Sequence, residues 1–441
     1  MYKKMTLLWF ILGLGYKLQI VASLSITEII VLVAAPFIFL RDYKMMKVDG
    51  IMPFFALSIM VVVGCVVASI ANKTEFMYVV RGLATTCLIS CSIIFSHWML
   101  RRDPAGFKWF VLGSAISLIL STFIFKQSVE VAIYGSSSED IMSGPTFWIA
   151  RIGQLVIAPI KGWYLHTPVT VSLVIPLALA LFSMVTTVSG RSAALGAIGF
   201  SALVLIGGKS RRTMNRISRH FWRLCICGGV VICAFYLTYK VSASQGWLGE
   251  AAQKKYEAQT AGGTGGVGRL LISGRAESFI GLLACRDKPI IGWGPWAEDV
   301  NEYWVEFIMK YGTLDDVINH QRRIARLIMS GQNLEIRKLE FHSYITEFWA
   351  WFGISGLVFW LYVIFALMRY LKQDVAAVPQ WFAWLACSIP GMLWAIFFSP
   401  FAERFGFPLL VVASLMARAV RLGRYQLPLA MIEETEKMHR R

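Results

Sequence analysis

The sequence predicts an all-α polytopic membrane protein, and both its composition and its apolar runs point to this class. Of the 441 residues, 57% are hydrophobic and only 16% are charged, whereas a soluble chain of this length carries roughly a quarter charged residues. Apolar runs of about 20 residues recur along the chain, and each is long enough to cross a bilayer as a helix.

Hydropathy and the positive-inside rule together predict about twelve transmembrane helices, with both termini in the cytoplasm. Loops 101–108 and 209–223 are rich in Lys and Arg. Both are therefore expected inside, and an even number of spans must separate them. This requires a weak span at 146–163. The expected spans are about 5–22, 26–40, 51–71, 77–96, 109–125, 146–163, 168–188, 192–208, 221–240, 344–368, 380–398 and 404–420.

The weak span at 146–163 has two interpretations. Charges inside a span are costly and usually face a cavity, so Arg151 and Lys161 are candidates for the lining of a polar crevice. Alternatively, 126–166 is an interfacial or re-entrant excursion in which Lys161 extends to the head groups.

The spans divide the chain into four regions. About nine spans fill 1–240, a long outer loop with short helices covers 241–342, three spans fill 343–420, and a cytoplasmic tail covers 421–441. Within the outer loop, Thr313-x-x-Asp316 predicts the start of an amphipathic helix. That helix lies either on the outer membrane face or over a small core of the loop itself.

The basic balance of the chain does not require a nucleic-acid partner. A net charge of +17 is compatible with one, but the basic residues lie in short loops between apolar runs, as the positive-inside rule requires. Residues 263–268 match a dinucleotide fingerprint in letters only, because no strand precedes them, and we interpret them as a flexible hinge. We expect no nucleic acid, no metal and no cofactor.

Three side chains suited to chemistry fall at the outer membrane boundary in this topology: Arg191, Arg275 and His342. Guanidinium groups bind phosphate oxygens in a bidentate manner and remain charged at any working pH, and histidine accepts a proton near neutral pH. Such a set suits a lipid pyrophosphate, because it can hold the leaving group and deprotonate an incoming hydroxyl. Each residue alone also fits a plainer role, as an interfacial anchor or a helix cap.

Three sequence blocks in this order resemble the O-antigen ligase and O-antigen polymerase superfamily over about 145–405. The stretch from Arg151 to Pro159 is similar to the family more loosely. The chain differs from the commonest family form at Ser343, where asparagine often follows the histidine, but serine can also cap a helix. The blocks are Ser189-Gly190-Arg191, Gly274-Arg275 followed by Pro289-Ile290-Ile291-Gly292-Trp293-Gly294, and His342-Ser343-Tyr344 leading into Glu347 and Gly353-Ile354-Ser355-Gly356.

The resemblance implies a multi-pass glycosyltransferase of the bacterial inner membrane, metal-independent and inverting, with its active site facing the periplasm. The donor would be a glycan on undecaprenyl pyrophosphate, and the acceptor a sugar hydroxyl on lipid A-core or another glycan. Arg191 and Arg275 would bind the pyrophosphate and stabilise its departing charge, and His342 would act as the base. Glu277 would orient Arg275 or take part in acceptor binding.

Three alternatives stay open. A polymerase that joins lipid-linked repeat units shares the same motifs, and a ligase is narrowly favoured over it. A polysaccharide or lipid transporter is disfavoured, because the two halves show no obvious repeat and a carrier does not need so long an outer loop. The third alternative is a non-catalytic scaffold in a polysaccharide assembly complex. The presence of Arg191, Arg275 and His342 argues only weakly against it.

Overall fold

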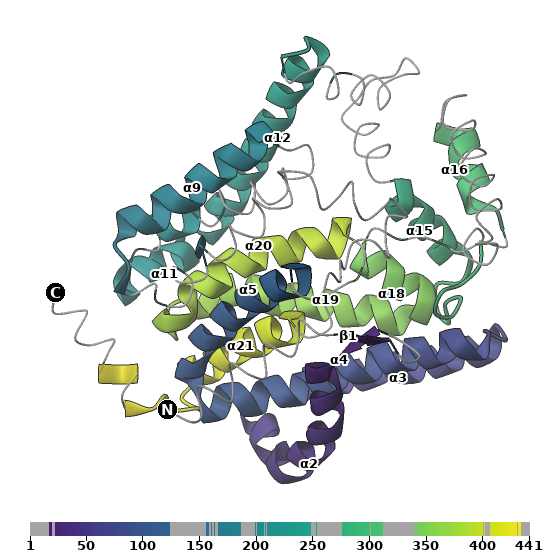
Figure 1. Cartoon of the computed structure of the whole chain (residues 1–441), viewed down its shortest axis with the longest axis horizontal. Helices are drawn as coiled ribbons and strands as arrows, with labels where there is room; N and C mark the ends of the chain where they lie inside the picture. Colours follow the sequence, from purple (N-terminus) through teal and green to yellow (C-terminus); the bar gives the residue numbers. More distant parts are fainter. Residues whose placement is uncertain are drawn as a thin grey trace.

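The structure is a computed structural model of the whole chain, in which helices cover most of the predicted apolar runs (Figure 1). The described residues are 17–19, 23–123, 156–157, 160, 163, 166–186, 199, 201–206, 208, 210–247, 253, 276–299, 301–311, 339, 341, 343–399, 401, 406–429 and 431–433.

Regular structure in the described residues is almost entirely helical, which confirms the all-α part of the prediction. The exception is a short antiparallel pair, β1 (Lys17–Gln19) and β2 (Ser23–Ser25). The predicted span at 5–22 is therefore wrong at its end, because backbone pairing with Ser23–Ser25 replaces helix there. The helices are α2 (Ile26–Val48), α3 (Met52–Ala71), α4 (Phe76–Arg102), α5 (Phe107–Phe123), α9 (Val169–Thr186), α11 (Arg211–Arg219), α12 (Phe221–Ser244), α15 (Ala276–Asp287), α16 (Tyr303–Tyr311), α18 (Tyr344–Phe352), α19 (Ile354–Arg369), α20 (Phe382–Phe398) and α21 (Gly406–Arg421), with a π-helical turn at Tyr370–Asp374.

The described helices have the length and surface of a membrane protein. Large apolar side chains lie on the outside of several of them, with Phe37 73%, Leu40 77% and Ile70 74% exposed. Lipid chains cover such surface, whereas in water it would promote association. The chain is therefore a helical membrane protein, while the full set of twelve spans and the cytoplasmic position of both termini stay predictions. Four described helices are long and apolar enough to cross a membrane: Met52–Ala71, Phe76–Arg102, Ile354–Asp374 and Pro379–Phe398.

The predicted single span at 344–368 is divided into two helices at Gly353. This residue has a φ of 63° and separates α18 from α19. A Cβ atom there would lie 1.9 Å from the carbonyl oxygen of Ile290. The approach of a distant loop therefore decides the break, and local hydropathy carries no sign of it.

α3 packs on α4, α18 and α19, and its two ends lie in different surroundings (Figure 1). It runs antiparallel to α19, since Phe54 stacks on Phe359 and Tyr362 with ring centroids 5.6 and 6.0 Å apart, while Gly64 faces Ser355. A Cβ atom at Gly64 would lie 2.1 Å from the Ser355 Oγ, so the two helices are in close contact. With 20 residues, α3 has ends about 30 Å apart.

A buried charged cluster fastens the turn between α2 and α3 to α4. The side chains of Asp49 and His97 are fully buried, with His97 Nε2 2.8 Å from Asp49 Oδ2. Arg101 donates to the same carboxylate oxygen, and the Tyr425 hydroxyl donates to the Arg101 carbonyl at 3.0 Å. A buried carboxylate needs such partners, because an unpaired charge in the interior is costly. The cluster therefore joins three parts of the chain at the start of α3.

Candidate functional site

The structure describes the frame of the predicted site, by which we mean α15, α18 and the described loop that joins α15 to α16. It describes fewer of the side chains that would carry out the chemistry. Glu277 is described, and it lies half-buried in the first turn of α15. The expected hinge at 263–268 and the expected helix beginning at Thr313 lie outside the described residues. So do the other predicted site residues, Arg151, Lys161, Arg191, Arg275 and His342.

α15 packs directly on α18, so the second and third sequence blocks of the resemblance share one core. Gly281 of α15 faces Phe341 and Thr346, and a Cβ atom at Gly281 would lie 2.8 Å from Phe341 Cδ1. One turn later, the Cys285 thiol donates to the Thr346 carbonyl at 3.7 Å. Burial raises the pKa of this thiol, so we interpret Cys285 as a packing residue and not as a nucleophile.

The first turn of α18 is anchored on α20. The buried Ser343 hydroxyl accepts the Thr346 backbone N–H at 3.3 Å and donates to the Ile396 carbonyl at 2.9 Å. The predicted capping role of serine at this position is thus confirmed. Glu347 is also buried, and its carboxylate accepts the Phe401 backbone N–H at 3.1 Å. Both side chains hold the start of α18 against the end of α20.

The Pro289–Gly294 motif lies against the end of α18, and positive φ values and close contacts require its glycines. Gly292 has a φ of 81°, and a Cβ atom there would lie 2.5 Å from the Gly353 backbone nitrogen. Gly294 donates its backbone N–H to the Trp351 carbonyl at 3.0 Å. Glycine adopts such positive φ values without strain and lets two backbones touch. Packing alone therefore accounts for the glycines of this motif.

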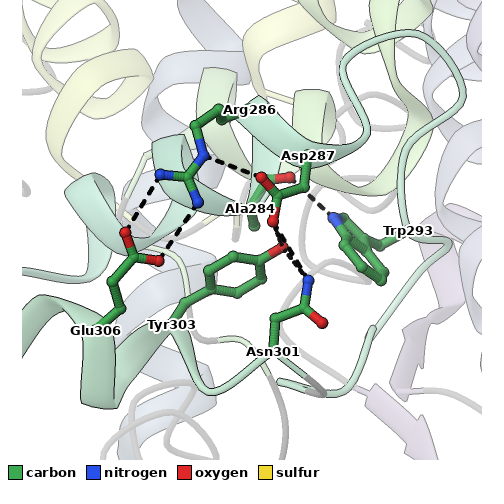
Figure 2. Close-up of polar contacts among 7 residues, drawn as sticks. All are labelled: Ala284, Arg286, Asp287, Trp293, Asn301, Tyr303 and Glu306. Atoms are coloured by element: carbon green, nitrogen blue, oxygen red, sulfur yellow. Dashed lines mark hydrogen bonds and ion pairs between the residues drawn. The ribbon is translucent and has the colours of Figure 1, made fainter.

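Asp287, the last residue of α15, is the centre of a polar network (Figure 2). Its carboxylate accepts the Tyr303 hydroxyl at 2.7 Å, the Asn301 amide at 3.3 Å and the Arg286 Nε at 2.9 Å. The Tyr303 hydroxyl and the Arg286 guanidinium hold the pKa of Asp287 below its usual value. Burial and the bond to this carboxylate raise the pKa of Tyr303. Arg286 also binds Glu306 through both terminal nitrogens, at 3.2 and 3.4 Å, which joins α16 to α15.

Trp293 and Lys288 fasten the loop to α15 and to the end of α3. The Trp293 indole N–H donates to the Ala284 carbonyl at 2.9 Å. The Lys288 ammonium lies 3.8 Å from the centroid of the indole ring, which is a cation–π contact. Lys288 also donates to the Asn72 side-chain carbonyl, and the Asn72 amide donates to the Gly292 carbonyl at 2.9 Å.

The contacts that hold this frame together join residues far apart in the sequence. Asn72 and Lys288 are 216 residues apart, and neither stands in a recognisable motif. Asp287 and Tyr303 likewise carry no sequence signal of the contact between them. The one usable signal was the spacing of glycines around Trp293, which predicts a tight turn without naming its partner.

The described part of the frame is held together by packing and by hydrogen bonds within the protein. It joins α15, which follows Arg275 in the sequence, to α18, and the Asp287 and Glu347 carboxylates accept hydrogen bonds from protein donors. In the part of the chain that the structure describes, no group of three or more His, Cys, Asp or Glu side chains has the arrangement of a metal site.

Comparisons of the chain with protein-family models, with curated proteins and with solved structures find no match. The resemblance to the O-antigen ligase and polymerase superfamily therefore rests on the three sequence blocks.

Proposed function

We propose that this protein is a membrane glycosyltransferase of the O-antigen ligase type. It transfers a glycan from undecaprenyl pyrophosphate to a sugar hydroxyl on lipid A-core, at the periplasmic face of the bacterial inner membrane. The observation that carries the proposal is the packing of α15 on α18. It supports the proposal because the helices that directly follow Arg275 and His342 in the sequence belong to one packed unit.

In the proposed mechanism, Arg191 and Arg275 bind the donor pyrophosphate. His342 accepts the proton of the acceptor hydroxyl, whose oxygen attacks the anomeric carbon from the side opposite the pyrophosphate. The bond from that carbon to the pyrophosphate oxygen breaks, so the configuration inverts, and the two guanidinium groups stabilise the departing charge. The guanidinium charge takes the place of a metal ion. Further substrate contacts are assigned to Glu277, Arg151 and Lys161.

Transfer assays with single variants test these roles. In proteoliposomes supplied with lipid-linked donor and acceptor, His342→Ala and Arg275→Ala should each lower the rate about 100-fold or more. His220→Ala and Arg223→Ala, in or beside the basic loop 209–223 that is predicted to be cytoplasmic, are matched controls and should retain full activity. Full activity in His342→Ala would remove the proposed base from the mechanism.

Two further experiments separate this proposal from its nearest alternatives. Activity should survive EDTA, and a loss that Mg²⁺ or Mn²⁺ restores would contradict the metal-independent mechanism. In a deletion strain, unlinked full-length polymer is expected for a ligase. A single capped repeat unit would instead identify a polymerase that uses the same site.

A further inference from the structure

The end of α3 opposite to the Asn72 contact holds a basic pocket that the proposed transfer reaction does not use. The pocket encloses about 430 Å³ between the end of α2, the start of α3 and the last turns of α19 and α21. Four cations line it: Lys47, Arg369, Arg418 and Arg424. None of the described residues that line it is acidic.

The carboxylates nearest to these cations are engaged elsewhere. Asp374 is close enough to attract Arg369 and Arg418, but it accepts a hydrogen bond from the Arg421 Nε. Asp49 follows the end of α2 and is held inside the buried cluster with α4. The four lining cations therefore exceed the negative charge that the surrounding described residues supply.

Two of the four lining cations, Arg369 and Arg418, have part of the guanidinium group buried beside the pocket. The Nε atoms of Arg369 and Arg418 are buried, and neither has a hydrogen-bond partner among the described residues. A buried donor without a partner is costly, and more so when it carries charge. The guanidinium fork matches the oxygens of a phosphate group. The pocket is thus suited to an anionic ligand with phosphate oxygens.

An exposed apolar stripe on α19 leads to the pocket. Ile354, Val358, Leu361 and Phe365 are 37 to 57% exposed, and their spacing places them on one face of the helix. Arg369 continues this face by one turn, with its guanidinium carbon 5.9 Å from the centroid of the Phe365 ring. α19 lies within one of the four candidate membrane spans. An apolar chain can therefore lie along the stripe while an attached phosphate reaches the arginines.

We propose that this pocket binds the phosphate group of an anionic phospholipid whose acyl chain lies along the α19 stripe. Basic pockets between membrane helices bind such head groups by charge and hydrogen bonding. A lipid in this position would contact α2, α19 and α21 together, and would neutralise the repulsion among their basic ends. The site is independent of the proposed transfer reaction, because it lies at the other end of α3.

Lipid retention by the full chain tests the proposal. Protein in detergent is offered an equal mixture of phosphatidylglycerol and phosphatidylcholine, and bound lipid is counted by native mass spectrometry. Wild type should retain the anionic lipid about tenfold more strongly, and the double variant Arg369→Gln with Arg418→Gln should lose this preference. The matched control, Arg212→Gln with Arg219→Gln on exposed positions of α11, should keep it. Equal retention of both lipids by wild type would overturn the proposal whether or not the variants fold.

Two more measurements distinguish a lipid from a free phosphate ion. A large excess of inorganic phosphate should leave phosphatidylglycerol bound to wild type, because the acyl chain contributes to binding. Complete displacement would show that the pocket takes free phosphate and would overturn the lipid assignment. Phe365→Ser should weaken retention of the anionic lipid severalfold, since it interrupts the stripe beside Arg369. Unchanged retention in that variant would contradict the path along α19.

Discussion

The two ends of α3 differ in how the basic side chains around them are paired, although the Asp49 cluster is paired at one end and the buried Trp351 Nε1 near the other lacks a partner in the described part of the chain. At the Asn72 end, the loop around Trp293 is held by hydrogen bonds within the protein, and glycines let backbones touch. At the Met52 end, four cations line a pocket, and the Nε donors of Arg369 and Arg418 have no partner among the described residues. Buried polar groups in proteins are normally paired. The first end therefore has the character of a rigid frame, and the second has the character of a surface that meets a ligand.

The largest effect is expected from breaking the backbone contact at the frame end. Gly353→Ala would place a Cβ atom 1.9 Å from the Ile290 carbonyl oxygen at a φ of 63°. Strain and overlap can be relieved only if the loop moves away from α18. We therefore expect the free energy of unfolding to fall by about 2–5 kcal/mol. The loss is measured as a lower melting temperature in detergent. Gly391→Ala, which has open space around it in α20, should be neutral or slightly stabilising. An unchanged melting temperature in Gly353→Ala would contradict the contact.

An intermediate effect is expected from the polar network of the frame. Asp287→Asn weakens the hydrogen bonds from Tyr303, Asn301 and Arg286. It should lower the free energy of unfolding by about 1–3 kcal/mol at neutral pH. The pKa of Asp287 is lower in the folded than in the unfolded state. Its carboxylate therefore stabilises the fold fully at pH values above its pKa in the unfolded state. That contribution is lost as the pH falls through the folded pKa.

Melting temperatures measured against pH test this network. The difference between wild type and Asp287→Asn should narrow below about pH 4, and a constant difference at every pH would contradict the assignment. Glu306→Gln is the matched control. It breaks an exposed ion pair and should change stability by no more than about 0.5 kcal/mol.

The smallest effect is expected at the basic end in the absence of lipid. Arg418→Gln removes a cation that lies close to Arg369 and Arg424, so stability in a zwitterionic detergent should stay within about 0.5 kcal/mol of wild type or rise slightly. Arg101→Gln is the contrast, because Arg101 donates to the buried Asp49 carboxylate, and it should destabilise the protein by about 1–3 kcal/mol. Equal losses in the two variants, again measured by melting temperature, would show that Arg418 is as firmly integrated as Arg101.

Several helices were predicted from the sequence to within a few residues. The run predicted at 51–71 is α3, the run at 380–398 is α20, and the cap at Ser343 is present. These features depend on apolar length and on bonds between residues three or four apart, which the sequence shows directly. The chemistry predicted for Arg191, Arg275 and His342 stays a prediction.

The sequence by itself determined that this protein is helical, apolar and basic in its short loops, because side-chain hydropathy and charge decide where a segment can reside relative to a bilayer. Only the tertiary structure decided where α18 ends, because the Ile290 carbonyl approaches Gly353 from a loop far away in the chain. It also decided that Asn72 and Lys288 meet, and that the basic residues of α19 and α21 line one pocket. These features are contacts between distant segments, and such contacts form only when the helices pack.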